Sequence, residues 1–157
     1  MVKRIEIVGD NYAGVYKMTR VACRAIIIND GKMLVSYEKK TDKMMTPGGG
    51  VEGSETNEEC CIRELAEEAG FVVKPIEYVL EITEYYRKAR FIHRYFICEI
   101  TGETERKLTE GEAAAGMEPR WLPIQEVIDT FATYEQHSKM WRGLYYRELT
   151  ALTNIFK

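Results

Sequence analysis

Alternating apolar and polar residues predict strands near the start of the chain. Residues 19–30, TRVACRAIIIND, and residues 31–39, GKMLVSYEK, are two β-rich runs that meet at Asn29-Asp30-Gly31. Asp-Gly supplies the positive φ angles of a tight turn, so the two runs are predicted to form a β-hairpin.

The pattern changes to a helical period after a glycine-rich loop and then returns to strands. Thr56, with Glu59 three residues later, forms the capping-box signal of a helix that begins near Asn57, and Gly70 is a typical stop. Residues 71–88 and 89–102 are long β-rich runs that turn near Arg87, which predicts a second hairpin.

The remaining third of the chain is predicted to be mostly helical. Residues 103–119 are polar and read as a mobile loop, 120–123 as a short strand, and a helix opens at Pro123. A last helix from about Glu135 carries an apolar stripe that is expected to pack on the sheet, or in part to form a homodimer contact. The stripe consists of Trp141, Leu144, Tyr145, Leu149, Leu152 and Phe156. With no internal repeat or linker, residues 1–157 are predicted to form one α/β domain.

Composition narrows the possible partners. The chain has 157 residues, a net charge of −3 and a pI of about 5.6, which argues against a nucleic-acid polymer or an anionic membrane as partner. No run of 18 apolar residues and no signal-peptide pattern is seen, so we expect a cytoplasmic protein. The four cysteines lack metal-site spacing and are predicted to be buried free thiols, and neither His93 nor His137 is assigned a catalytic role.

The helix that begins near Asn57 has an unusual acidic face. Glu64, Glu67 and Glu68 repel one another at i,i+3 and i,i+4 spacing, and Arg63 relieves only part of that repulsion. Hard divalent cations prefer such oxygen ligands, so a metal site and a solvated face are about equally supported by the charge pattern. The neighbouring loop, Pro47-Gly48-Gly49-Gly50, has almost no side chains and allows close approach of a phosphate or metal.

Taken together, these residues resemble the signature of the Nudix hydrolase family. Gly49, Glu55, Arg63-Glu64-Leu65, Glu67-Glu68 and Gly70-Phe71 occupy every fixed position of the Nudix box, which spans residues 49–71. The resemblance implies an α/β/α sandwich with a mixed sheet flanked by helices. It also implies that Glu64, Glu67, Glu68 and the Gly49 carbonyl bind Mg²⁺ or Mn²⁺. Glu55 and Arg63 would form an ion pair that supports the site, and Gly48 and Gly50 flank the glycine ligand.

The implied reaction is hydrolysis of a nucleoside diphosphate linked to a group X, by water attack at phosphorus. Glu64, Glu67 and Arg63 would belong to the catalytic site, and Glu112 sits where the family often has a general base on a loop. Glu110 is the near alternative, and a solvated loop acid is an equally simple interpretation of Glu112.

The resemblance leaves the substrate open. A dNTP, an NTP or a modified nucleotide is favoured, and dinucleoside polyphosphates, nucleotide sugars and a non-catalytic nucleotide-binding module are the alternatives. Tyr85-Tyr86 lies near a tyrosine that marks dinucleoside polyphosphate hydrolases, although a core or surface role is more common for strand tyrosines. Arg20 and Arg24 are candidates for phosphate contacts. The candidates for base stacking are Tyr37, Phe91, Tyr95 and Trp121.

Overall fold

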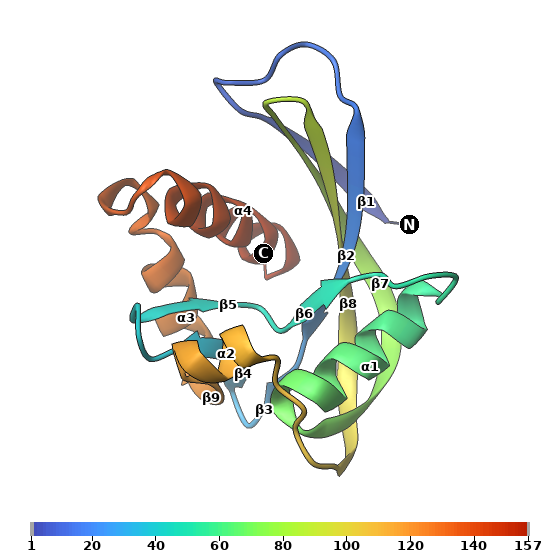
Figure 1. Cartoon of the computed structure of the whole chain (residues 1–157). Helices are drawn as coiled ribbons and strands as arrows, with labels where there is room; N and C mark the ends of the chain where they lie inside the picture. Colours follow the sequence, from blue (N-terminus) through green and yellow to red (C-terminus); the bar gives the residue numbers. More distant parts are fainter. Residues whose placement is uncertain (1, 157) are drawn as a thin grey trace.

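The computed structural model describes residues 2–156 and contains the predicted strands and helices in a layered arrangement (Figure 1). The strands are β1 (Lys3–Val8), β2 (Met18–Ile26), β3 (Ile28–Asn29), β4 (Lys32–Glu38), β5 (Lys43–Met45), β6 (Gly48–Gly50), β7 (Phe71–Tyr86), β8 (Ala89–Glu103) and β9 (Met117–Pro123). The helices are α1 (Asn57–Ala69), α2 (Glu110–Ala115), α3 (Ile124–Phe131) and α4 (Lys139–Ile155), with a 3₁₀ turn, η1 (Tyr134–Gln136).

Two sheets make up the middle layer within the described residues. One sheet has the order β1-β7-β8-β2-β6, and it is mixed because β1–β7 and β2–β8 are parallel while β7–β8 and β2–β6 are antiparallel. The other sheet has β4 between β9 and β5, with β3 also pairing with β4. Helices α1 and α4 lie on opposite sides of the long strands (Figure 1). The predicted α/β/α sandwich with a mixed sheet is therefore confirmed.

Each face of the long strands buries its own apolar cluster. On the α1 side, Cys23 and Ala25 of β2 pack with Leu65 of α1, and all four cysteines are buried as free thiols, as predicted. On the α4 side, Ile26 and Ile82 pack with residues of α4. The apolar stripe of α4 belongs to this second cluster, which confirms that it packs on the sheet.

The first predicted hairpin is only partly correct. Its turn is present, with φ of 53° at Asp30 and 74° at Gly31, but only the short β3 pairs with β4 across it. The longer β2 belongs to the other sheet, where it pairs with β8 and β6. Strand β2 contributes residues to both apolar clusters, so it needs cover on both faces, which an isolated hairpin does not provide.

Two other parts of the chain differ from the prediction. The polar segment expected to be a mobile loop contains α2. This helix begins with a capping box between Thr109 and Glu112 and ends at Gly116. The last helix begins at Lys139 rather than near Glu135, because Ser138 is its N-cap and the preceding residues form η1. The hairpin of β7 and β8 is as predicted and turns at Arg87. Among residues 2–156, no helix combines the length and apolar character needed to cross a bilayer.

Replacing Gly70 by alanine tests the end of α1. Gly70 has φ of 76°, and a Cβ there would lie 2.9 Å from the Thr104 carbonyl oxygen. We expect Gly70→Ala to lower the free energy of unfolding by about 1–2 kcal/mol, because an L side chain is strained in that conformation. Gly143 of α4 has open space at the same position, so Gly143→Ala should instead raise stability by about 0.5–1 kcal/mol. Urea unfolding of both variants measures the difference, and equal effects would contradict the assignment.

Candidate active site

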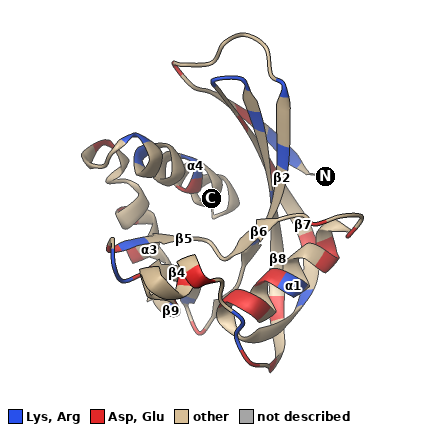
Figure 2. Ribbon diagram, in the orientation of Figure 1, with Lys and Arg blue, Asp and Glu red and all other residues tan. Residues whose placement is uncertain are grey.

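The end positions of α1 determine which of its residues face the site. Thr56 accepts a hydrogen bond from the backbone of Glu59, the Glu59 side chain accepts one from the Thr56 backbone, and Gly70 ends the helix, as predicted. Because Cys61 and Leu65 are buried on the sheet side, Glu64 and Glu67 point away from the α1–sheet core. The acidic residues gathered on α1 are visible in Figure 2.

The glycine loop lies directly against this acidic face. A Cβ on Gly49 would lie 2.5 Å from Glu64 Oε1, so glycine lets the carboxylate in its present position rest on the backbone. A Cβ on Gly48 would run into the Cys23 carbonyl, and one on Gly50 would lie 3.0 Å from the Arg20 guanidinium. The Gly49 carbonyl oxygen accepts a hydrogen bond from the Cys60 thiol, with an S···O distance of 3.4 Å. Sterics therefore require glycine at position 48, and at positions 49 and 50 the missing side chain leaves room for the Glu64 carboxylate and the Arg20 guanidinium.

Arg63 connects the loop to the helix. Its Nε and Nη2 donate to the two carboxylate oxygens of Glu55 at 3.0 and 2.7 Å, and Nη2 also donates to the Gly50 carbonyl at 2.9 Å. Its Nη1 donates to Glu64 at 2.9 Å and to Glu67 at 3.3 Å. The hydrogen-bonded guanidinium lowers the pKa of Glu55 to about 2. The structure thus contains the expected Glu55–Arg63 ion pair, and the same arginine draws two of the predicted ligands together.

Glu68 is a buried carboxylate without a directly bonded cation among the described residues. It is 5% exposed, and its side chain accepts a hydrogen bond from the Ser36 hydroxyl of β4. Burial raises its pKa to about 7, and the charges of Glu64 and Glu112 act in the same direction. Burial also raises the pKa of Glu64, against the opposing effect of Arg63. Negative charge is therefore held here at a cost that a bound cation would remove.

These oxygens suit a hard divalent cation, but they are not yet gathered around one point. Within residues 2–156, no three His, Cys, Asp or Glu side chains are arranged as a finished metal site. The reason lies in their present partners, since Arg63 holds Glu64 and Glu67 while Ser36 holds Glu68. The all-oxygen set of three carboxylates beside the Gly49 backbone fits Mg²⁺ or Mn²⁺, and binding would require these side chains to turn away from Arg63 and Ser36.

The structure also locates the candidate general base. Glu112 lies in α2, where its carboxylate accepts a hydrogen bond from the Thr109 backbone at 2.9 Å. Its charge contributes to the raised pKa values of both Glu64 and Glu68, which places it on the site side of α2. The charge of Glu112 is among the largest effects on both carboxylates and that of Glu110 is not, which favours Glu112 over Glu110.

The residues considered for substrate contacts do not form one surface. Tyr95 is fully buried, and Trp121 packs edge-on against Phe71. Tyr37 lies under the Arg120 guanidinium, 3.6 Å from ring centre to Cζ.

Phe91, which is partly buried, and the exposed Tyr86 remain as a pair whose ring centres lie 4.9 Å apart, and Arg20 is the register partner of Phe91 on β2. Arg24 is buried and binds the backbone of Thr46. No local sequence pattern indicates the role of Ser36, because its partner Glu68 is 32 residues away.

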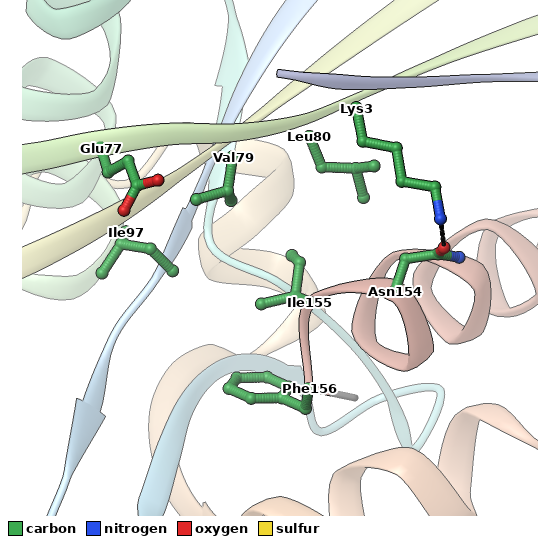
Figure 3. Close-up of a pocket in the computed structure, with 8 residues that line it drawn as sticks. All are labelled: Lys3, Glu77, Val79, Leu80, Ile97, Asn154, Ile155 and Phe156. Carbon is green, nitrogen blue, oxygen red and sulfur yellow. Dashed lines mark hydrogen bonds between the residues drawn. The ribbon is translucent and has the colours of Figure 1, made fainter. Parts of the chain in front are cut away.

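A pocket of about 340 Å³ lies elsewhere, between β7, β8 and the end of α4 (Figure 3). Apolar side chains such as Val79 and Phe156 line it, and Lys3 donates to Asn154 at 2.5 Å across its edge. It contains none of the candidate metal-binding, catalytic or substrate-binding residues, and the candidate active site is instead the surface formed by the glycine loop, α1 and α2.

Comparison with known proteins agrees with this arrangement. Residues 18–143 match the NUDIX domain, so the chain belongs to this family and is a Nudix hydrolase by class. No curated protein matches the sequence.

Solved structures share the fold. A NUDIX hydrolase from Nitrosomonas europaea is 21% identical with a TM-score of 0.62, and the match covers 85% of this chain and 89% of that one. An ADP-ribose pyrophosphatase from Streptococcus suis is 13% identical with a TM-score of 0.52, covering 88% and 92%. A UDP-X diphosphatase is 21% identical with a TM-score of 0.57, covering 71% of this chain, which spans only 54% of that protein.

Glu68→Gln tests whether the site holds unfavourable charge. The folded-state pKa of Glu68, about 7, lies above its usual 4.5, so its ionised form destabilises the fold above pH 7 and the penalty disappears as the pH falls below 4.5. In EDTA at pH 8, we expect the variant to be more stable by up to about 3 kcal/mol, with the gap closing at low pH. Glu67, with a side chain 43% exposed, provides the control, since Glu67→Gln should change stability little. Urea unfolding from pH 4 to 8 gives both values, and a gap independent of pH would contradict the interpretation.

Proposed function

We propose that the protein is a metal-dependent pyrophosphohydrolase that cleaves a nucleoside diphosphate linked to a group X, with a dNTP, an NTP or a modified nucleotide as its substrate. The observation that carries the proposal is the packing of Glu64 directly on Gly49, beside Glu67 and the buried Glu68. No stability argument explains three carboxylates in this position, whereas a cation-bound phosphate chain does.

Each residue has a distinct task in this proposal. Glu64, Glu67, Glu68 and the Gly49 carbonyl would hold Mg²⁺ or Mn²⁺, which when bound lowers the pKa of an attacking water and takes up charge on phosphate oxygens. Arg63 keeps Gly50 and Glu55 in place, so the loop stays beside the helix. Glu112 accepts the proton of the attacking water from the α2 side.

Side chains of β2, β7 and β8 offer contacts for the nucleotide. Arg20 lies against Gly50, at the end of the glycine loop, and is positioned to contact a phosphate. Phe91 lies next to it on β8 and is stacked on Tyr86, which leaves the outer face of the pair for a base.

Two alternatives follow from the same surface. A dinucleoside polyphosphate or a nucleotide sugar would use the same phosphate contacts, and the names of two structural neighbours, an ADP-ribose pyrophosphatase and a UDP-X diphosphatase, refer to related diphosphates. A nucleotide-binding module without turnover is the other alternative, and the complete set of box residues argues against it.

Turnover of a nucleotide panel tests the proposal. With Mg²⁺ or Mn²⁺ we expect pyrophosphate or phosphate from a dNTP or oxidised dGTP, or two phosphorylated products from ADP-ribose, a dinucleoside polyphosphate or a nucleotide sugar. No product is expected with EDTA. Glu67→Gln should lower kcat about 10²–10³-fold, because it removes a proposed metal ligand. Glu59→Gln is the control, since Glu59 is exposed on the same helix and glutamine preserves the capping box. Nucleotide binding without turnover under either metal would support the binding-module alternative.

A comparison of Glu112→Gln with Glu110→Gln tests the general base. Glutamine at 112 can still cap α2, so any loss of activity reports on proton transfer rather than on the helix. We expect kcat to fall about 10²–10⁴-fold for Glu112→Gln, with unchanged Mn²⁺ affinity, and to stay near the wild-type value for Glu110→Gln. Equal activity of the two variants would exclude Glu112 as the base.

A further inference from the structure

The segment that leads into the glycine loop is held by side chains of the C-terminal helix. Tyr145 Oη accepts a hydrogen bond from the Met44 backbone at 3.1 Å, and Glu148 Oε2 accepts one from the Thr46 backbone at 2.5 Å. Strand β5 pairs with β4 along its other edge. Helix α4 therefore takes the place of a neighbouring strand for the residues just before Gly48.

The carbonyl groups of the same segment are bound by a side chain of β2. Arg24 Nη1 donates to the Thr46 carbonyl at 3.0 Å and to the Gly48 carbonyl at 3.5 Å. Glu148 and Arg24 thus hold both the N–H and the C=O of Thr46, a residue only three positions before Gly49. The side chain of each is buried, so these bonds are shielded from water.

The network behind Glu148 keeps it ionised. Burial opposes the charge, but Arg147 and Arg24 outweigh this effect and lower the pKa of Glu148. Its other oxygen accepts from the Tyr95 hydroxyl at 2.6 Å, and that hydroxyl accepts from Arg147 at 3.2 Å.

This network is costly for a purely structural contact. Among residues 2–156, the buried side-chain atoms that lack a hydrogen-bond partner all belong to it or touch it: Arg24 Nε, Thr46 Oγ1, His93 Nδ1 and Arg147 Nη2. The last of these still forms an ion pair with Glu148 Oε1 at 3.5 Å. Apolar residues of similar volume would attach α4 to the sheet without burying atoms that lack a hydrogen-bond partner. What apolar residues cannot supply is an acceptor at the Thr46 N–H and a donor at its carbonyl.

We propose that Glu148, with Arg24, positions the Thr46–Gly50 segment and thereby fixes the place of the Gly49 carbonyl relative to Glu64. Both are positioning residues, since their side-chain hydrogen bonds go to Thr46, Gly48 and Tyr95 and not to the proposed ligands. The inference rests on the proposed function, because it assigns the segment's rigidity to metal binding.

Mn²⁺ binding without substrate, measured by electron paramagnetic resonance, tests the inference. Glu148→Gln replaces one of two acceptors, and the double variant R147M/E148M removes both acceptors together with one buried charge of each sign. Glu84 loses its ion pair with Arg147 in this variant and keeps its bond to His93. We expect the Mn²⁺ dissociation constant to rise about 10–100-fold in the double variant, and amide exchange at Thr46 to accelerate in the metal-free protein. Glu148→Gln should show the same changes to a smaller degree.

Tyr95→Phe is the matched control, because it breaks the bond to Glu148 on the far side and leaves the Thr46 contact in place. It should lower stability while leaving Mn²⁺ affinity and Thr46 exchange close to the wild-type values. Unchanged Mn²⁺ affinity in R147M/E148M, with faster Thr46 exchange, would overturn the inference alone. A wild-type protein that binds no Mn²⁺ would overturn the proposed metal site and the inference together, and Glu67→Gln, which should weaken Mn²⁺ binding without affecting Thr46 exchange, separates the two.

Discussion

The candidate active site depends on the hydrogen bonds of one guanidinium group, that of Arg63. It binds Glu55, Glu64, Glu67 and the Gly50 carbonyl at once, so a single side chain joins the loop, the start of α1 and its acidic face. The remaining carboxylate, Glu68, lies outside its reach and is held by Ser36 from the second sheet. Gly50, which Arg63 binds, belongs to β6 in one sheet, and Ser36 belongs to β4 in the other. Both sheets therefore contribute a hydrogen-bonding partner to the acidic face.

The buried negative charges of Glu64 and Glu68 lower the stability of the fold, which indicates that they serve another purpose. A protein selected for stability alone would not bury Glu68 beside Glu64 with a hydroxyl as its partner. Buried acidic groups with raised pKa values occur where a fold gives up stability for chemistry. The contrast with Glu55 shows that the environment decides, since the same side-chain type has a lowered pKa when it receives two hydrogen bonds from Arg63.

Local signals in the sequence predict both ends of α1 correctly. A capping box, a terminal glycine and a helical period each concern neighbours along the chain, and they gave the correct bounds as well as the correct acidic face. The same capping signal occurs at Thr109 and Glu112, but it lies within a polar segment whose composition predicts a loop, and α2 forms there instead. Contacts such as Thr46 to Glu148, which are 102 residues apart, have no pattern in the sequence. The pairing of β2 with β8 rather than with β4 is unpredictable for the same reason, since the two strands are far apart in the sequence.

The position of Glu148 has a consequence for where this domain ends. The region that matches the NUDIX domain stops at residue 143, yet the side chains that hold the segment before Gly49 are Tyr145 and Glu148. The boundary of sequence similarity therefore does not coincide with the boundary of the working unit. Fusions, truncations or domain exchanges designed at that boundary would separate the box from one of its own supports, and the second half of α4 should be treated as part of the catalytic module.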